Sequence, residues 1–132
     1  MITEAIKNLF ESQDLVVVAT TSADGTPNAV PIYWKKIVDE KTIWFADNFM
    51  KKTAENVQAN PKCCVSFWDA KTEESYKLVG TATYHSGDEK HLECIKWLQS
   101  INPAKNPKGL VEFVVEEVYN LMPGENAGKK IE

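Results

Sequence analysis

Six short apolar segments, separated by turn signals, constrain the fold of this chain more than any other feature. They span residues 15–20, 28–36, 42–46, 62–68, 76–85 and 110–121. The segments are rich in β-branched and aromatic residues, which favour strands. Asp24-Gly25 and Asp39-Glu40-Lys41 lie between successive segments, and such sequences are typical of hairpin turns. We therefore predict six mainly antiparallel strands that form a barrel or a sandwich.

Three segments with helical periodicity accompany these strands, and we expect short helices at the ends of the sheet. They span about residues 2–10, 49–59 and 86–100. Asp47 and Asn48 are good N-cap residues for the second helix. Ser86 and Glu89 have the spacing of a capping box at the start of the third, which should turn Leu92 inward.

Two residues inside the predicted strands indicate local irregularities. Pro31 has no backbone N–H to pair, so its strand should lie at an edge of the sheet or contain a bulge. Gly80 marks either a bulge or a close approach of another backbone segment.

The size and charge of the chain limit the classes of function. Its 132 residues are enough for one domain, which we assign to residues 1–132, with an irregular polar tail over 122–132. The chain carries 15 basic and 19 acidic side chains, a net charge of −4, and all of the basic residues are lysines. General nucleic-acid binding is therefore not expected, because it requires a basic field.

Membrane association and secretion are not expected either. The longest apolar runs, such as Leu15–Ala19, are too short to span a bilayer, and the N-terminus lacks the apolar core of a signal peptide. The three cysteines are an odd number without the spacing of a disulfide framework, which suits a reducing compartment. We therefore expect a cytoplasmic protein.

The most informative polar segment is Lys51-Lys52-Thr53, at the expected start of the second helix. Two lysines oppose the helix dipole there, but they become useful if an anion docks on the free N–H groups of the first turn. A phosphate group would then meet the helix dipole, two ammonium groups and a hydroxyl. The alternative is a solvated helix end, with Lys51 paired to Glu55.

Other groupings of reactive side chains are weaker. His91 and Cys94 have helical i,i+3 spacing and would supply only half of a zinc site. His85, Ser86 and Asp88 include the residue types of a hydrolase triad, but triads are defined by geometry, and Ser86 serves better as a helix cap. We therefore assign no metal ligand and no catalytic side chain.

The order of these features resembles that of the FMN-binding split barrels, the group that includes the pyridoxamine phosphate oxidases and small FMN-binding proteins. The matching features are Val30-Pro31, Trp44-Phe45-Ala46, Lys51-Lys52-Thr53, Asn56-Val57 and Asn60-Pro61. The order of elements matches over about residues 1–121, and the specific part spans 24–68. The resemblance implies a six-stranded antiparallel split β-barrel with short helices at its ends.

The resemblance also implies which residues contact the cofactor. Lys51, Lys52 and Thr53 would bind the phosphate of FMN. Val30, Pro31 and Ile32 would lie along the isoalloxazine ring and offer backbone N–H and C=O groups to its polar edge.

Two more residues would line the same site according to the resemblance. They are Ala46 and Asp47, at the end of the strand that precedes the second helix. Members of this group form homodimers with FMN at the interface, so a second copy would close each site.

The resemblance implies an FMN-dependent oxidoreductase that uses an unknown small-molecule electron donor or acceptor. Pyridoxamine phosphate oxidases carry arginine- and histidine-bearing substrate motifs near the C-terminus, whereas this chain has no arginine. Action on pyridoxamine phosphate itself is therefore not expected. The alternatives are a non-enzymatic FMN electron carrier, the same fold binding haem or a deazaflavin, and an interaction domain without a ligand.

Overall fold

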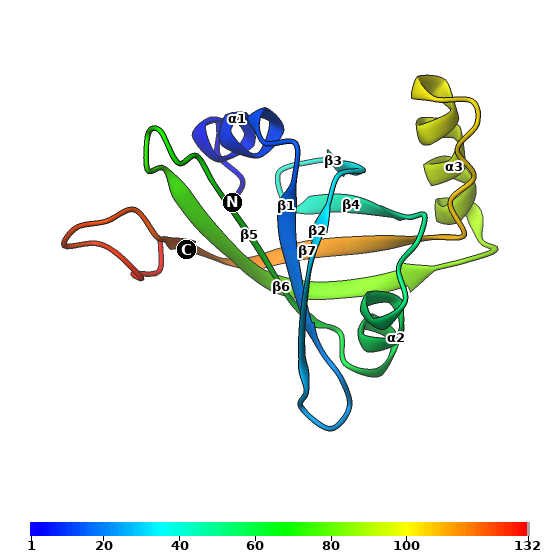
Figure 1. The fold of residues 1–132 in the computed structure, drawn as a ribbon, viewed down its shortest axis with the longest axis horizontal. Coiled ribbons are helices and arrows are strands. Elements are labelled where there is room, and N and C mark those ends of the chain that lie inside the picture. Colours follow the sequence, from blue (N-terminus) through cyan, green and yellow to red (C-terminus); the bar gives the residue numbers. More distant parts are fainter. Residues whose placement is uncertain (132) are drawn as a thin grey trace.

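The computed structural model describes residues 1–131, which form three helices and one seven-stranded sheet (Figure 1). The helices are α1 (Glu4–Ser12), α2 (Lys52–Ala59) and α3 (Glu89–Ile101). The strands are β1 (Val16–Thr21), β2 (Pro27–Ile32), β3 (Lys35–Ile37), β4 (Thr42–Asp47), β5 (Lys62–Trp68), β6 (Ser75–His85) and β7 (Gly109–Asn120).

The sheet is antiparallel throughout and has the order β2-β1-β5-β6-β7-β4-β3. Its two edge strands, β2 and β3, are consecutive in the chain and are separated only by Tyr33 and Trp34. The sheet must therefore curl until its edges approach each other, and no strand pairing joins them within residues 1–131. The predicted antiparallel split barrel with short helices is confirmed.

The predicted number of six strands is wrong. The segment expected as one strand, 28–36, divides at Tyr33 and Trp34. The part before this break pairs with β1, and the part after it pairs with β4 at the other edge of the sheet. A continuous apolar pattern does not reveal such a division, because both halves keep strand geometry.

The main core fills the inside of the curled sheet. Alternate residues of β1, β5 and β6 are buried, and α1 closes one end of the barrel while α2 lies at the other end (Figure 1). Phe10 of α1 packs edge-on against Phe67, with 5.3 Å between ring centroids. A second cluster joins α3 to the outer face of β4 and β7 through Trp44, Cys94 and Leu98. As a result, β4 is covered on both faces.

The two irregularities predicted from proline and glycine are confirmed. Pro31 lies in edge strand β2, and the register with β1 continues through it without a shift, because an edge strand tolerates a residue with no N–H to pair. The register of β6 with β7 shifts between Val79 and Gly80. A Cβ at Gly80 would lie 2.0 Å from the carbonyl oxygen of Val114, so this position needs glycine for a close backbone approach.

The predicted starts of two helices are wrong. Helix α2 begins at Lys52 rather than near residue 49, because the Asp47 carboxylate accepts the Met50 N–H and closes a turn before the helix. Asp88, not Ser86, caps α3 by accepting the His91 N–H. Leu92, expected to face inward, is half exposed on α3.

The end of the chain follows β7 as a series of turns that fold back onto the sheet. Lys130 forms an isolated bridge with Tyr119, and Ile131 donates its N–H to the Val118 carbonyl. Residues 122–131 contain turns and bends with a single bridge residue, and Glu132, the last residue of the predicted irregular tail, lies outside the described residues. None of the helices described in residues 1–131 is long and apolar enough to cross a membrane.

Candidate functional site

A cleft of about 400 Å³ lies between edge strand β2 and the beginning of α2. It is lined by Val30, Pro31, Ile32, Tyr33, Trp34, Ala46, Asn48, Phe49, Met50, Lys51, Lys52 and Thr53. The structure thus brings together all of the residues predicted to contact a cofactor except Asp47, although they come from three separate segments. Their role as cofactor contacts stays a prediction.

The wall formed by β2 offers backbone groups as well as apolar side chains. Because β2 is an edge strand, its outer side is not paired with another strand within residues 1–131. Trp34, just after the strand, accepts the Ala46 N–H through its carbonyl at 3.0 Å, which continues the β3–β4 pairing by one residue and fixes the connection that follows β2. A flat ligand that lies along β2 therefore meets a fixed strip of backbone.

The sequence prediction missed five lining residues, which follow the predicted ones directly in the chain. They are Tyr33, Trp34, Asn48, Phe49 and Met50. Phe49 is 90 % exposed and Tyr33 is 56 % exposed, which is unusual for large aromatic side chains. Their aromatic character is visible in the sequence, but a pattern of residues does not show that they reach the rim of a cleft.

The other end of the cleft is the start of α2. Glu55 is the first residue of this helix whose N–H is bonded, to the Lys51 carbonyl at 3.1 Å. The N–H groups of Lys52, Thr53 and Ala54 have no partner within residues 1–131, and no side chain caps the helix. These three N–H groups form a positively polarised end where an anion can bind.

The two lysines at this helix start differ in their contacts. Lys52 Nζ lies 3.4 Å from Glu55 Oε2, and both side chains are more than half exposed. The Lys51 side chain makes no ion pair within the described part of the chain, and Glu55 pairs with Lys52 rather than with Lys51. The Lys51 ammonium group is therefore available to bind an anion. Lys52 can bind one by giving up its exposed ion pair with Glu55, which contributes little to stability.

A buried polar network lies behind the helix start. Asn28 Nδ2 donates to Thr53 Oγ1 at 3.2 Å and lies 3.3 Å from Thr20 Oγ1. Asn56 Nδ2 donates to the same Thr20 oxygen at 3.1 Å. Thr20, Thr53 and Asn56 are each less than 5 % exposed. This network fixes β1, β2 and α2 to one another next to the cleft.

Asp47 is completely buried and faces the loop rather than the cleft. Its carboxylate accepts the Met50 N–H at 2.8 Å and the Tyr84 hydroxyl at 2.5 Å. Lys108 Nζ lies 4.0 Å from this carboxylate and donates to the Met50 carbonyl at 2.7 Å. Burial, and then the hydrogen bond to Asp47, raise the pKa of the Tyr84 phenol. Asp47 therefore shapes the cleft by holding the loop over residues 48–51.

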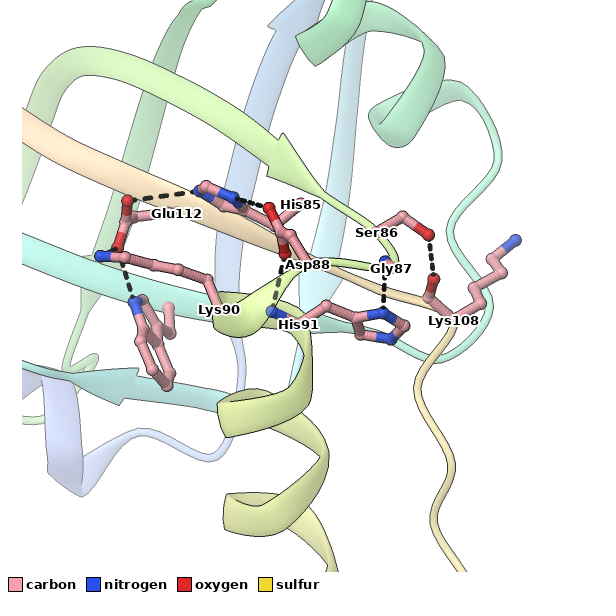
Figure 2. Close-up of polar contacts among 9 residues, drawn as sticks. His85, Ser86, Gly87, Asp88, Lys90, His91, Lys108 and Glu112 are labelled. Atoms are coloured by element: carbon pink, nitrogen blue, oxygen red, sulfur yellow. Dashed lines mark hydrogen bonds and ion pairs between the residues drawn. The ribbon is translucent and has the colours of Figure 1, made fainter.

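The residue types of a hydrolase triad do not form one. Figure 2 shows His85 between two carboxylates, with Nδ1 2.7 Å from Asp88 Oδ2 and Nε2 3.4 Å from Glu112 Oε1. The Ser86 hydroxyl instead donates to the Lys108 carbonyl at 2.9 Å (Figure 2). The imidazole thus has no serine to activate, and the cluster fastens α3 to β6 and β7.

His91 and Cys94 do not share a site. His91 Nδ1 accepts the Gly87 N–H at 2.8 Å (Figure 2). Its Nε2 lies 2.8 Å from the Pro107 carbonyl. Cys94 is completely buried in the second core cluster. Within residues 1–131, no group of three or more His, Cys, Asp or Glu side chains is arranged to hold a metal ion.

Comparison with known proteins assigns the chain to a family. Residues 2–122 match the family model described as pyridoxamine 5'-phosphate oxidase. An uncharacterised protein of Methanocaldococcus jannaschii is 35 % identical over 130 residues, which cover 97 % of this chain and 85 % of that protein. The crystal structure of HupZ from Group A Streptococcus is 34 % identical, with a TM-score of 0.85 over 97 % of this chain and 100 % of that one.

More distant structures share the fold alone. An FMN-binding protein from Syntrophomonas wolfei superposes with a TM-score of 0.75 at 12 % identity, over 89 % of this chain and 84 % of that chain. HutZ of Vibrio cholerae, described as a haem storage protein, superposes with a TM-score of 0.67 at 12 % identity, over 90 % of this chain and 94 % of that chain. The same architecture therefore occurs in proteins named for different cofactors.

Proposed function

The chain belongs to the pyridoxamine 5'-phosphate oxidase family, and from that premise we propose that it is a flavoprotein that binds FMN in the cleft beside β2. The observation that carries this proposal is the pairing of two features in one cleft. One end is an uncapped helix start with two lysines, and the wall is an apolar edge strand with free backbone groups. FMN has a phosphate for the first and a flat ring for the second.

The residues fit the two ends of FMN in different ways. Lys51, Lys52 and Thr53 would hold the phosphate through two ammonium groups, a hydroxyl and the N–H groups of the first helical turn. The ring would lie along Val30 and Ile32, with its polar edge toward the backbone of β2. Lysine serves here where a guanidinium fork is absent, because the chain has no arginine.

Bound FMN would supply hydride or single-electron transfer, and we propose that the protein is an oxidoreductase for a small-molecule donor or acceptor. The chain's own residues bind and orient the ring and shield one of its faces. The charged side chains that line the cleft are Lys51 and Lys52, and both belong to its phosphate end. We therefore propose that this chain supplies no acid or base at the ring, and that pyridoxamine phosphate is not its substrate.

The rim of the cleft supports a homodimer with the cofactor at the interface. Phe49 and Tyr33 expose most of their aromatic surface beside the open side of the cleft. Exposed apolar surface of this kind is typical of a binding interface. We propose that a second copy covers it, and sedimentation of Phe49→Asp against the unmodified protein tests this. The variant should sediment as a monomer, and an unchanged dimer would refute this placement of the interface.

An electron carrier without its own substrate is the second candidate, because Val30, Pro31 and Ile32, the β2 residues proposed to lie along the ring, carry no polar side chain. Steady-state turnover with NADH or NADPH and a panel of quinone and nitroaromatic acceptors distinguishes the two. Saturable turnover with one organic substrate supports the enzyme. Slow reduction that does not depend on the identity of the acceptor supports the carrier.

Haem fits the cleft less well than FMN. Imidazole is a common axial ligand of haem iron, yet both His85 and His91 lie outside the cleft and are bonded to other groups. A haem carboxylate could also bind at the start of α2, but a phosphate dianion carries more charge and accepts more of the N–H and ammonium donors there. A deazaflavin would use the same phosphate end, so only identification of the bound molecule separates it from FMN.

The phosphate assignment is tested by titrating FMN and riboflavin, which lacks the phosphate, into the double variant Lys51→Ala, Lys52→Ala. We expect FMN affinity to fall about tenfold to a hundredfold, from the loss of charge-assisted hydrogen bonds. Riboflavin affinity should stay unchanged. The matched control is Lys129→Ala, Lys130→Ala, an adjacent lysine pair in the segment that lies away from α2 (Figure 1). An equal loss for both flavins, or no loss, would place the phosphate elsewhere.

A further inference from the structure

We propose that Asn28 is a positioning residue that fixes the Thr53 hydroxyl as a hydrogen-bond donor to the phosphate of the bound flavin. This inference rests on the proposed function and names a determinant of its specificity. Asn28 lies on β2, the strand that would carry the ring, whereas Thr53 lies in the first turn of α2. One side chain would therefore connect the ring wall to the phosphate end.

The direction of the Thr53 hydroxyl proton depends on what the hydroxyl oxygen accepts. A threonine hydroxyl has one proton to donate and two lone pairs that accept. Asn28 Nδ2 donates to Thr53 Oγ1 at 3.2 Å, so this oxygen acts as an acceptor toward the strand. The Thr53 hydroxyl donates to no group within residues 1–131, although the residue lines the cleft and is only 2 % exposed. Its proton is therefore left for a ligand in the cleft.

The orientation of the Asn28 amide is itself held by a second threonine. Nδ2 of Asn28 lies 3.3 Å from Thr20 Oγ1, and this oxygen also accepts from Asn56 Nδ2 at 3.1 Å. The two amides thus present their donor groups to the two threonines. Because Thr20, Thr53 and Asn56 are almost completely buried, water cannot readily replace any of these contacts.

This arrangement distinguishes ligands by their ability to accept hydrogen bonds. The groups at this end of the cleft are the N–H groups of Lys52, Thr53 and Ala54, the two ammonium groups and the Thr53 hydroxyl, and all of them donate. A phosphate dianion accepts from every one of them. The hydroxyl that ends the side chain of riboflavin accepts weakly and would have to turn its own proton away. Asn28 should therefore contribute to the preference for FMN over riboflavin.

The test is a double-mutant cycle on Asn28→Ala and Thr53→Val, with FMN and riboflavin titrated into each ligand-free protein. We expect each single variant to lose about tenfold in FMN affinity, and riboflavin affinity to change less than about twofold. The double variant should bind FMN no more weakly than Thr53→Val alone, because Asn28 acts through Thr53. Thr53→Ser keeps the hydroxyl and should restore FMN affinity. Thr53→Ala replaces Thr53→Val if that variant does not fold.

Asn56→Ala is the matched control, because Asn56 is in the same network and bonds to Thr20 but not to Thr53. Thermal melts should show a loss of stability, yet the ratio of FMN to riboflavin affinity should stay within about twofold of the unmodified protein. Additive losses in the double variant, or parallel losses for both flavins, would overturn the positioning role.

The two proposals can fail separately. If the unmodified protein does not bind FMN, the proposed function is wrong and the role of Asn28 falls with it. If the unmodified protein prefers FMN strongly and Asn28→Ala keeps the full preference, only the positioning role is wrong.

Discussion

The buried hydrogen bond from Tyr84 to Asp47 predicts a specific loss of stability in Tyr84→Phe. The variant keeps the ring and removes only the hydroxyl that donates to the carboxylate at 2.5 Å. Asp47 is 0 % exposed, so water cannot replace the missing donor. Its remaining partners are the Met50 N–H at 2.8 Å and Lys108 at 4.0 Å.

The expected cost is about 2 kcal/mol, the usual value for a buried hydrogen bond to a charged group. For a chain of this length that corresponds to a fall of about 7 °C in the melting temperature. The control is Tyr119→Phe, whose hydroxyl donates to Glu117 at 3.3 Å near the surface and should cost less than about 0.5 kcal/mol. The measurement is urea unfolding of both variants, followed by circular dichroism.

The pH dependence of this difference follows from the raised pKa of the Tyr84 phenol. A raised pKa in the folded state means that folding favours the protonated phenol. Its contribution is therefore complete below the ordinary tyrosine pKa and is lost only as the pH rises through the higher value of the folded state. The cost of Tyr84→Phe should be constant between about pH 6 and 9. If Tyr84→Phe and Tyr119→Phe lower the free energy of unfolding by the same amount, the hydrogen bond from Tyr84 to Asp47 does not anchor the loop.

Two further predictions concern the sheet and the thiols. Gly80→Ala should lower the free energy of unfolding by about 3 kcal/mol, because its Cβ would lie 2.0 Å from the Val114 carbonyl oxygen. An unchanged midpoint in urea unfolding would refute this close approach. Burial raises the pKa of Cys63 to about 12 and that of Cys94 to about 11, so both stay protonated and unreactive toward a thiol reagent at pH 8. The half-buried Cys64 should react first, and all three thiols should react in denaturant. Rapid labelling of two or three thiols in the native protein would contradict the burial of Cys63 and Cys94.

The sequence predicts the strands well because most of them alternate between buried and exposed positions and end at clear turn signals. Pro31 and Gly80 are informative because each has a backbone property that limits where it can lie in a sheet. The missed division at Tyr33 and Trp34 has a different origin. It is decided by which edge of the sheet each half joins, and this depends on the curvature of the entire barrel.

In the candidate site too, the sequence predicts features that depend on neighbouring residues and misses those that depend on residues far along the chain. Lys51-Lys52-Thr53 can be found from the sequence because a helix start concentrates polar groups within one turn. The role of Asp47 cannot be found in this way, because its partners Tyr84 and Lys108 lie far along the chain. The sequence also predicts too early a start for α2, because Asp47 is a typical helix-cap residue but closes the preceding turn instead.

The central claim is that this protein binds FMN in the cleft beside β2, and the freshly purified protein tests it most directly. The measurement is a near-ultraviolet and visible absorption spectrum, followed by heat release and mass identification of any ligand. We predict a two-banded flavin spectrum and FMN in the supernatant. A haem spectrum, or a colourless protein that also fails to bind added FMN, would contradict the account.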